Sequence, residues 1–138
     1  MSATGLIVTT ERRMVLGLGA SGQSVARWWQ SRGLPFIAAD TRAEMANVGA
    51  GRDATAGASE TFFGEIDLKV VEDISELVVS PGIALDQPLV RHARDLGVRV
   101  IGDVDIFVEV ANAPVVGITG SNGKSTVTTL VGEMLRSA

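Results

Sequence analysis

The sequence predicts an α/β protein in which a parallel sheet carries helices on both faces. Short apolar segments alternate with helix-like segments along the chain, which is typical of a doubly wound sheet. Two glycine-rich segments each follow an apolar segment and open a helix-like one. The turn sequence Asn112-Ala113-Pro114 interrupts the pattern. We therefore expect a first domain at 1–112 and, at 113–138, the first strand, phosphate loop (P-loop) and helix of an incomplete second α/β domain.

Composition narrows the class of protein. The chain has 138 residues, 46% of them hydrophobic, which is enough for one domain with a real core. Its net charge of -4 argues against a nucleic-acid-binding surface. The chain has no cysteine, which excludes disulfides, thiolate metal sites and cysteine nucleophiles. No segment approaches the ~18 apolar residues of a membrane span. We expect a cytoplasmic protein without a nucleic-acid or membrane partner.

The first elements follow from local patterns. Residues 14–19 are apolar and end in glycines, which predicts a buried strand. A helix is expected over 21–32, because helically spaced apolar residues precede a glycine: Val25, Trp28, Trp29 and Gly33. Residues 35–40 predict a second strand that ends in Asp40. Residues 42–60 are rich in alanine and glycine without a clear period, so we expect a poorly formed helix followed by a mobile loop.

The rest of the first domain is expected to contain three strands and two helices, in the order strand 60–65, strand 76–82, helix 86–96, strand 98–102 and helix 103–111. Pro81-Gly82 stops the second of these strands. The first of these helices has one apolar face, formed by Leu85, Leu89, Ala93 and Leu96. Strands and helices therefore alternate up to the turn at 112–114.

The last segment predicts a strand at 115–120 and a helix at 124–136. The helix has an apolar stripe at i, i+3, i+4, i+7 and i+8, formed by Val127, Leu130, Val131, Met134 and Leu135. Each such side chain contributes about 1.5–3 kcal/mol when fully buried, so the stripe needs a neighbouring sheet. We expect 115–138 to be less ordered than 14–110, or to associate with a second copy.

The first glycine-rich motif is Gly17-x-Gly19-x-x-Gly22, between a predicted strand and a predicted helix. Glycines allow a sharp turn and close approach of a ligand, and the helix N-terminus offers free N–H groups. Asp40 ends the next strand, at the distance where Rossmann-like domains place an acid on a ribose. This predicts nucleotide binding. The alternative is that the glycines only permit tight packing and Asp40 caps a turn.

The second motif is a phosphate loop between an apolar segment and a helix, formed by Gly120, Ser121, Asn122, Gly123, Lys124, Ser125 and Thr126. Its backbone N–H groups can wrap a phosphate, Lys124 can neutralise phosphate charge and the Ser125 hydroxyl can ligate Mg²⁺. The common pattern has a glycine where Ile118 stands, so this loop is a shorter variant. We expect ATP and Mg²⁺ to bind here. The alternative is a glycine-rich turn with a surface lysine.

Together these motifs resemble the Mur ligases, the ATP-dependent amide-forming enzymes of peptidoglycan precursor synthesis. The resemblance spans nearly the whole chain and is carried by GLGASG, DTR, SPGIAL, GDVDIF and APVVGITGSNGKSTVTTLVGEM. DTR (40–42) and SPGIAL (80–85) point to the members that join D-glutamate to UDP-N-acetylmuramoyl-L-alanine. The resemblance implies that the first loop binds the UDP part of this substrate rather than NAD.

The resemblance also implies roles for individual residues. Ala20 and Ser21, after Gly19, would contact the uridine and the phosphates. Asp40 would accept from the uracil N–H, with Thr41 and Arg42 beside it, and Gly82 would line the same pocket. Residues 120–126 would hold ATP, with Lys124 and Ser125 as the catalytic residues. The substrate carboxylate would attack the γ-phosphate to give an acyl phosphate, which the amine of D-glutamate would then displace.

The family enzymes have three domains, whereas this chain would supply the first and the start of the second. The resemblance therefore implies that the chain by itself has no ligase activity. Two other functions stay open on the residues alone. One is an NAD-binding oxidoreductase domain, supported by the first glycine motif and Asp40. The other is a non-catalytic nucleotide-binding module in which this chain is the functional unit.

Overall fold

The computed structural model describes residues 11–137. The chain divides into two compact units, with the division after Phe107, and each unit is described by itself. The first unit contains a sheet of five strands and most of the helices. Among the described residues, no helix combines the length and the apolar character that a membrane crossing requires.

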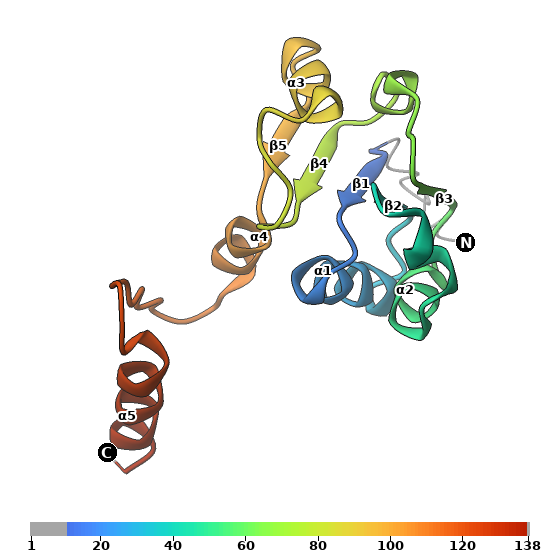
Figure 1. The fold of residues 1–138 in the computed structure, drawn as a ribbon. Coiled ribbons are helices and arrows are strands. Elements are labelled where there is room, and N and C mark those ends of the chain that lie inside the picture. The colour runs from blue at the N-terminus through green and yellow to red at the C-terminus, as the bar shows by residue number, and fades with distance from the viewer. Residues whose placement is uncertain (1–10, 138) are drawn as a thin grey trace, which may run out of the picture. The chain divides into compact units, whose positions relative to one another are not determined.

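The sheet of the first unit is parallel throughout (Figure 1). Its strands are β1 (Arg13–Leu16), β2 (Ile37–Asp40), β3 (Glu60–Phe63), β4 (Glu76–Val79) and β5 (Arg99–Ile101). The spatial order is β3-β2-β1-β4-β5, so β1 is central and Val15 lies between Ala38 of β2 and Val78 of β4. Along the chain, β2 and β3 are added on one side of β1, and β4 and β5 are then added on the other side. This reversal between β1 and β4 is the switch point of a doubly wound sheet.

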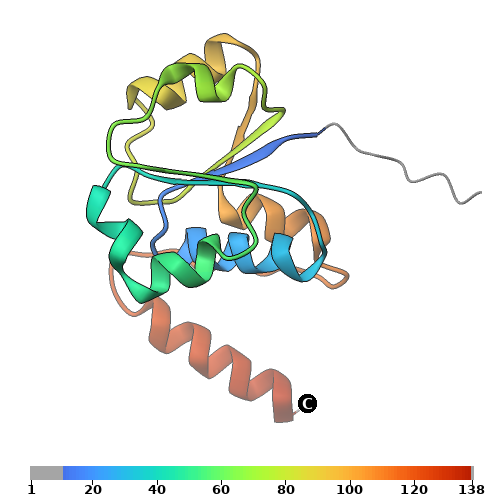
Figure 2. The same cartoon turned by 90° about the vertical axis from the view of Figure 1, so that its right-hand side faces the viewer.

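Helices cover both faces of the sheet (Figure 2). They are α1 (Ala20–Ser31), the 3-10 helix η1 (Ala43–Asn47), α2 (Gly49–Thr55), the 3-10 helix η2 (Leu68–Val71), α3 (Pro88–Asp95) and α4 (Asp103–Val110). Successive strand residues point to opposite faces. Val15, Ala38 and Val78 pack with α1 and with Ile106 of α4, whereas Met14, Leu16 and Leu77 pack with α3 and η2. The predicted sheet with flanking helices is therefore confirmed.

The expectation for 42–60 was wrong in its details. In place of one poor helix and a loop, the structure has η1 and α2, and a short turn at 56–59 then leads into β3. Met45 and Ala54 are buried in the core on the α1 face, and this burial fixes a segment that has no regular apolar period. Gly51 lies so close to Met45 that an added Cβ would stand 2.1 Å from the Met45 carbonyl oxygen. Tertiary packing thus orders a sequence with weak local preference.

The apolar face predicted for helix 86–96 was also only partly right. Leu89 and Ala93 are buried together with Val90, whereas Leu85 and Leu96 flank α3 and are 54% and 49% exposed. The helix is shorter than expected because Gln87 caps its N-terminus, accepting from the N–H groups of Leu89 and Val90. Capping therefore set the first residue of this helix.

Among the described residues of the second unit, α5 (Lys124–Ser137) is the one complete regular element, and the last three residues of α4 also fall in this unit. The predicted helix at 124–136 is confirmed, but the strand predicted at 115–120 was wrong, because these residues form no regular structure. A strand needs a hydrogen-bonded neighbour, and in the described part of the chain no other strand pairs with this segment. Four residues of the apolar stripe of α5 are exposed: Val127, Leu130, Met134 and Leu135 are 46%, 58%, 64% and 71% exposed. The fifth, Val131, is half-buried.

Candidate functional site

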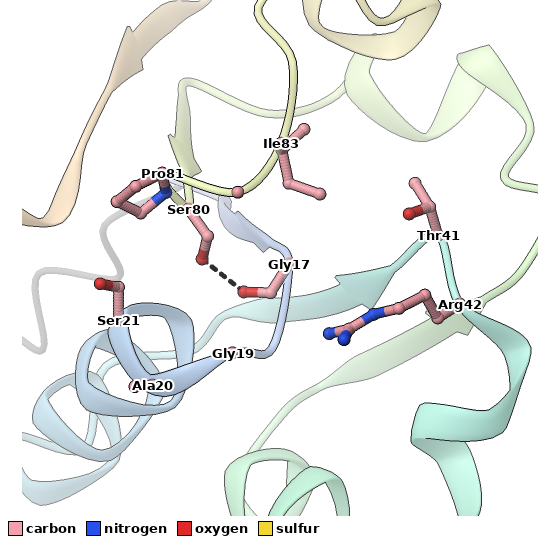
Figure 3. A pocket seen from close by; sticks show the side chains of 10 residues that line it. Gly17, Gly19, Ala20, Ser21, Thr41, Arg42, Ser80, Pro81 and Ile83 are labelled. Atoms are coloured by element: carbon pink, nitrogen blue, oxygen red, sulfur yellow. Dashed lines mark hydrogen bonds between the residues drawn. The ribbon is translucent and has the colours of Figure 1, made fainter.

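A pocket of about 410 Å³ lies in the first unit where three parallel strands end (Figure 3). It is lined by the segments that follow β1, β2 and β4: Gly17, Gly19, Ala20, Ser21, Thr41, Arg42, Ser80, Pro81, Gly82 and Ile83. Because β1 and β4 flank the switch point, the connections on either side of it leave in opposite directions and open a crevice. This is where doubly wound sheets place their ligands.

The pocket brings together most of the residues that the sequence predicted for a UDP site. Six of these line it: Gly19, Ala20, Ser21, Thr41, Arg42 and Gly82. The seventh, Asp40, is fully buried beneath it. Sequence reasoning missed Ser80, Pro81 and Ile83 as lining residues. The signal available was the SPG turn directly after a strand, but only the sheet order shows that this strand adjoins β1.

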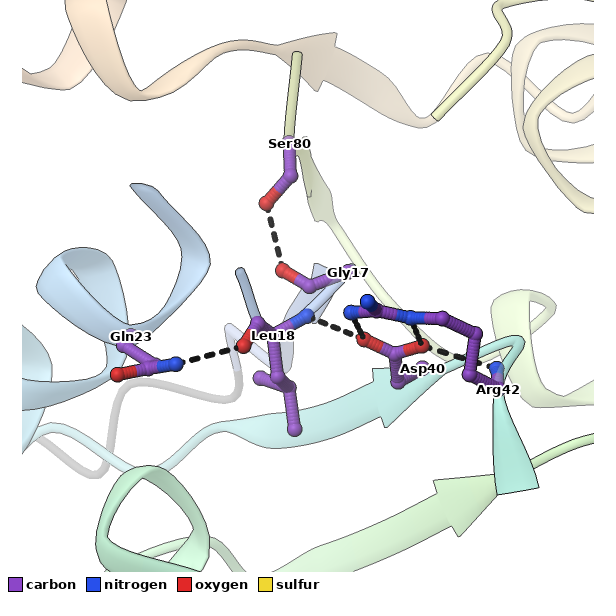
Figure 4. A network of polar contacts seen from close by, with 6 residues as sticks. All are labelled: Gly17, Leu18, Gln23, Asp40, Arg42 and Ser80. Carbon is purple, nitrogen blue, oxygen red and sulfur yellow. Dashed lines mark hydrogen bonds and ion pairs between the residues drawn. The ribbon is translucent and has the colours of Figure 1, made fainter. Parts of the chain in front are cut away.

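One peptide unit of the glycine loop is held from both sides (Figure 4). The hydroxyl of Ser80, after β4, donates to the Gly17 carbonyl at 2.5 Å. The N–H of Leu18, on the other side of the same peptide, donates to Asp40 Oδ2 at 2.7 Å. Both side chains are buried, so they supply these backbone groups with the partners that water cannot. The orientation of the Gly17–Leu18 peptide is therefore fixed by the two strands that flank β1.

Two glycines of this loop lie so close to neighbouring atoms that a larger residue would clash. Gly17 has a φ of +91°, and a Cβ there would stand 2.9 Å from a carbon of Ile83. A Cβ on Gly22 would stand 1.8 Å from the Gly17 carbonyl oxygen. The Gln23 side chain completes the turn by donating to the Leu18 carbonyl at 2.8 Å. The loop and the first turn of α1 thus pack backbone against backbone.

The N-terminus of α1 faces the pocket and has an uncapped start. Gly19 is its N-cap residue and has no side chain to accept from the first N–H groups of the helix. Ala20 and Ser21 follow directly and line the pocket. Free N–H groups at a helix N-terminus, together with the helix dipole, favour an anion such as a phosphate.

Asp40 is the most highly bonded polar group of the site (Figure 4). Its Oδ1 accepts from the backbone N–H and the Nε of Arg42, both at 2.9 Å. Its Oδ2 accepts from Arg42 Nη2 at 2.8 Å and from the Leu18 N–H. Burial raises the pKa of Asp40, but the bonds from Arg42 and Leu18 outweigh burial and hold this pKa below its ordinary value of 3.8. The same pairing raises the pKa of Arg42.

The predicted phosphate loop lies in the second unit and leads into α5, which begins at Lys124. Gly123 has a φ of +78°, the left-handed conformation that glycine adopts without strain. The Lys124 ammonium donates to the Gly120 carbonyl of its own loop. Residues 120–126 are exposed. In the described ranges of the chain, no group of three or more histidine or acidic side chains could hold a metal ion.

The residues of this loop fit an ATP and Mg²⁺ site of the phosphate-loop kind. A glycine-rich turn followed by a helix N-terminus presents backbone N–H groups to phosphate oxygens. Lys124 and Ser125 occupy the first two positions of α5 and supply a positive charge and a hydroxyl oxygen. The loop lies in a different unit from the pocket.

Comparisons with known proteins bear on the first unit directly. The model of the MurD-like Mur ligase N-terminal domain matches residues 11–102. UDP-N-acetylmuramoylalanine–D-glutamate ligase of Pseudomonas aeruginosa is 47% identical over 129 residues, which are 94% of this chain and 29% of that protein. The ligase of the same name from Marinobacter nauticus is 40% identical over 135 residues, 96% of this chain and 30% of that protein.

A solved structure shares the fold. The pseudomurein peptide ligase type C from Methanothermus fervidus matches 91% of this chain and 26% of its own, with a TM-score of 0.58 and 23% identity, a likeness of fold alone. The chain spans less than a third of the length of the curated relatives described above. The matched residues 11–102 contain the whole sheet and the pocket. The chain therefore belongs to the MurD-like Mur ligase family, of which it carries the N-terminal domain.

Proposed function

We propose that the pocket binds the UDP part of UDP-N-acetylmuramoyl-L-alanine. One observation carries this proposal: three segments far apart in the sequence, 19–21, 41–42 and 82, line one pocket at the switch point. The curated relatives are named for a reaction of UDP-N-acetylmuramoylalanine, which supports the same substrate class. An NAD-binding domain is the weaker reading, because the family match points to ligases.

In this proposal, different residues of the pocket bind different parts of the ligand. The uncapped N-terminus of α1, with Gly19, Ala20 and Ser21, holds the diphosphate by backbone N–H groups. Asp40, at the end of β2, accepts from the nucleobase N–H. Thr41 and Arg42 lie at the same strand end, and Gly82 leaves space across the pocket because an added Cβ there would meet no atom within 4 Å.

For the whole protein we propose a cytoplasmic ligase that joins D-glutamate to UDP-N-acetylmuramoyl-L-alanine with hydrolysis of ATP. In this proposal 1–112 is the UDP-binding domain and 113–138 is the start of the ATP-binding domain. ATP supplies the phosphoryl group that activates the substrate carboxylate. Gly120 to Thr126 bind its phosphates, Lys124 balances their charge, and the Ser125 hydroxyl ligates Mg²⁺.

Calorimetric titration with UDP and, separately, with NAD tests the assignment of the pocket as a UDP site. We expect UDP to bind the chain and NAD not to bind. The variant Gly82→Leu would fill the pocket without a clash at Cβ and should abolish UDP binding. Gly49→Leu is the matched control, since Gly49 also has open space and lies at the start of α2. Binding of NAD instead of UDP, or UDP binding that survives in Gly82→Leu, would reject the assignment.

A further inference from the structure

The Asp40 carboxylate has no free acceptor position. An ionised carboxylate has two oxygens with about four lone-pair sites. Four donors occupy them: the backbone N–H groups of Leu18 and Arg42, and the Nε and Nη2 of the Arg42 side chain. All four distances lie between 2.7 and 2.9 Å, and Asp40 is 0% exposed. A ligand N–H can reach this carboxylate only if one of the four donors leaves.

The four donors differ in their freedom to leave. The Leu18 N–H belongs to the peptide that Ser80 also holds, so it is fixed by the turn. The Arg42 N–H is part of the backbone directly after β2. The Arg42 side chain is different, because it is 51% exposed and lines the pocket (Figure 3). Its guanidinium can exchange Asp40 for water at the pocket surface.

We propose that the Arg42 side chain is a competing donor that a nucleobase must displace from Asp40, which makes Arg42 a determinant of the ligands that the pocket accepts. The proposal rests on the proposed UDP site. Displacement of the guanidinium removes two donors from Asp40. A ligand with an N–H aimed at Asp40 restores one of them, whereas a ligand without one leaves the buried carboxylate with the two backbone donors alone. Once displaced, the guanidinium stays at the pocket edge, where its charge attracts the diphosphate.

Removal of an arginine that only binds the ligand weakens binding. Removal of an arginine that competes with the ligand for Asp40 should strengthen it. With uridine, which carries no phosphate, the attraction of the guanidinium for the diphosphate is absent and only competition for Asp40 remains. Arg42→Met removes both competing donors and keeps the length of the side chain. We expect uridine to bind Arg42→Met about three- to tenfold more tightly than the wild type, measured at pH 8. Equal or weaker binding would overturn the proposal.

The control is Arg91→Met, which makes the same charge change on the exposed surface of α3 and should leave uridine binding unchanged. A second measurement follows the wild-type protein directly and uses a variant only to assign one signal. In ¹⁵N-labelled wild-type protein, the Arg42 Nε–H signal, assigned by its loss in Arg42→Lys, should be protected from exchange with water. Saturation with uridine, which has no phosphate that could hold the displaced guanidinium, should raise its exchange rate at least about tenfold, because the bond to Asp40 is broken.

The two proposals fail in different ways. If amide signals of Gly19 and Ser80 report saturation by uridine while the Arg42 Nε–H stays protected, uridine binds without displacing Arg42 and the competition is refuted. If UDP shifts no signal of the pocket, the UDP site is refuted and the competition with it.

Discussion

Ser80 and Asp40 bind the two sides of one peptide unit, Ser80 donating to the Gly17 carbonyl and Asp40 accepting from the Leu18 N–H. The two side chains come from the ends of β4 and β2, which lie on either side of β1. The turn after β1 is therefore set by its neighbours in the sheet as well as by its own glycines. Because this turn leads into the N-terminus of α1, the same two residues fix the direction of the N–H groups that face the pocket.

Removal of the Ser80 hydroxyl should destabilise the first unit. Ser80→Ala leaves the buried Gly17 carbonyl without a donor, and an unsatisfied buried acceptor costs about 1–3 kcal/mol. The free energy of unfolding from urea denaturation measures this loss. Ser24→Ala on the exposed face of α1 is the control and should change the free energy by less than about 0.5 kcal/mol. Equal effects of the two variants would show that the Ser80 bond does not stabilise the turn.

The glycines of the first loop should differ sharply in their tolerance of a methyl group. Gly22→Ala places a Cβ 1.8 Å from the Gly17 carbonyl oxygen, so the turn must open. We expect a loss of about 1–3 kcal/mol in the free energy of unfolding. Gly19→Ala is the matched control, because a Cβ there meets nothing within 4 Å and the φ of Gly19 is -71°. Similar stability of the two variants would contradict the close packing of this turn.

The contribution of Asp40 to stability should depend on pH. Its pKa in the folded protein lies below the ordinary 3.8, so the folded state favours the ionised form. The stabilisation is complete above the unfolded pKa and is lost as the pH falls through the lower folded pKa. Asp40→Asn should therefore be less stable than the wild type at pH 7, with a difference that shrinks below about pH 4. Urea denaturation from pH 7 to pH 2.5 measures it. A pH-independent difference would mean that ionisation of Asp40 does not matter.

The exposed stripe of α5 should cause self-association. Leu130 and Met134 are 58% and 64% exposed on a helix with no buried residue. We expect the sedimentation coefficient of the chain to rise with protein concentration, because contact between stripes removes apolar surface from water. Leu130→Glu should suppress the rise, whereas Thr129→Glu, on the polar side of α5, should not. Concentration-independent sedimentation of the wild type would refute this prediction.

Local signals in the sequence predicted the elements well where the apolar period was regular. Trp29 on α1 and Leu89 on α3 are buried as their spacing suggested. Apolar periodicity did not predict the elements at 42–60, where Met45 and Ala54 are held by contacts with distant residues. It also failed at 115–120, because an apolar segment becomes a strand only when another strand pairs with it.

The sequence by itself determined the alternating α/β pattern, the glycines of the first turn and the acid at the end of β2, because each depends on spacing along the chain. Only the tertiary structure decided that Ser80 meets Gly17, since 63 residues separate them and the order of the strands brings them together. It also decided the state of Asp40. The sequence shows a carboxylate that a ligand could use, whereas the fold buries it and fills its acceptor positions with Leu18 and Arg42.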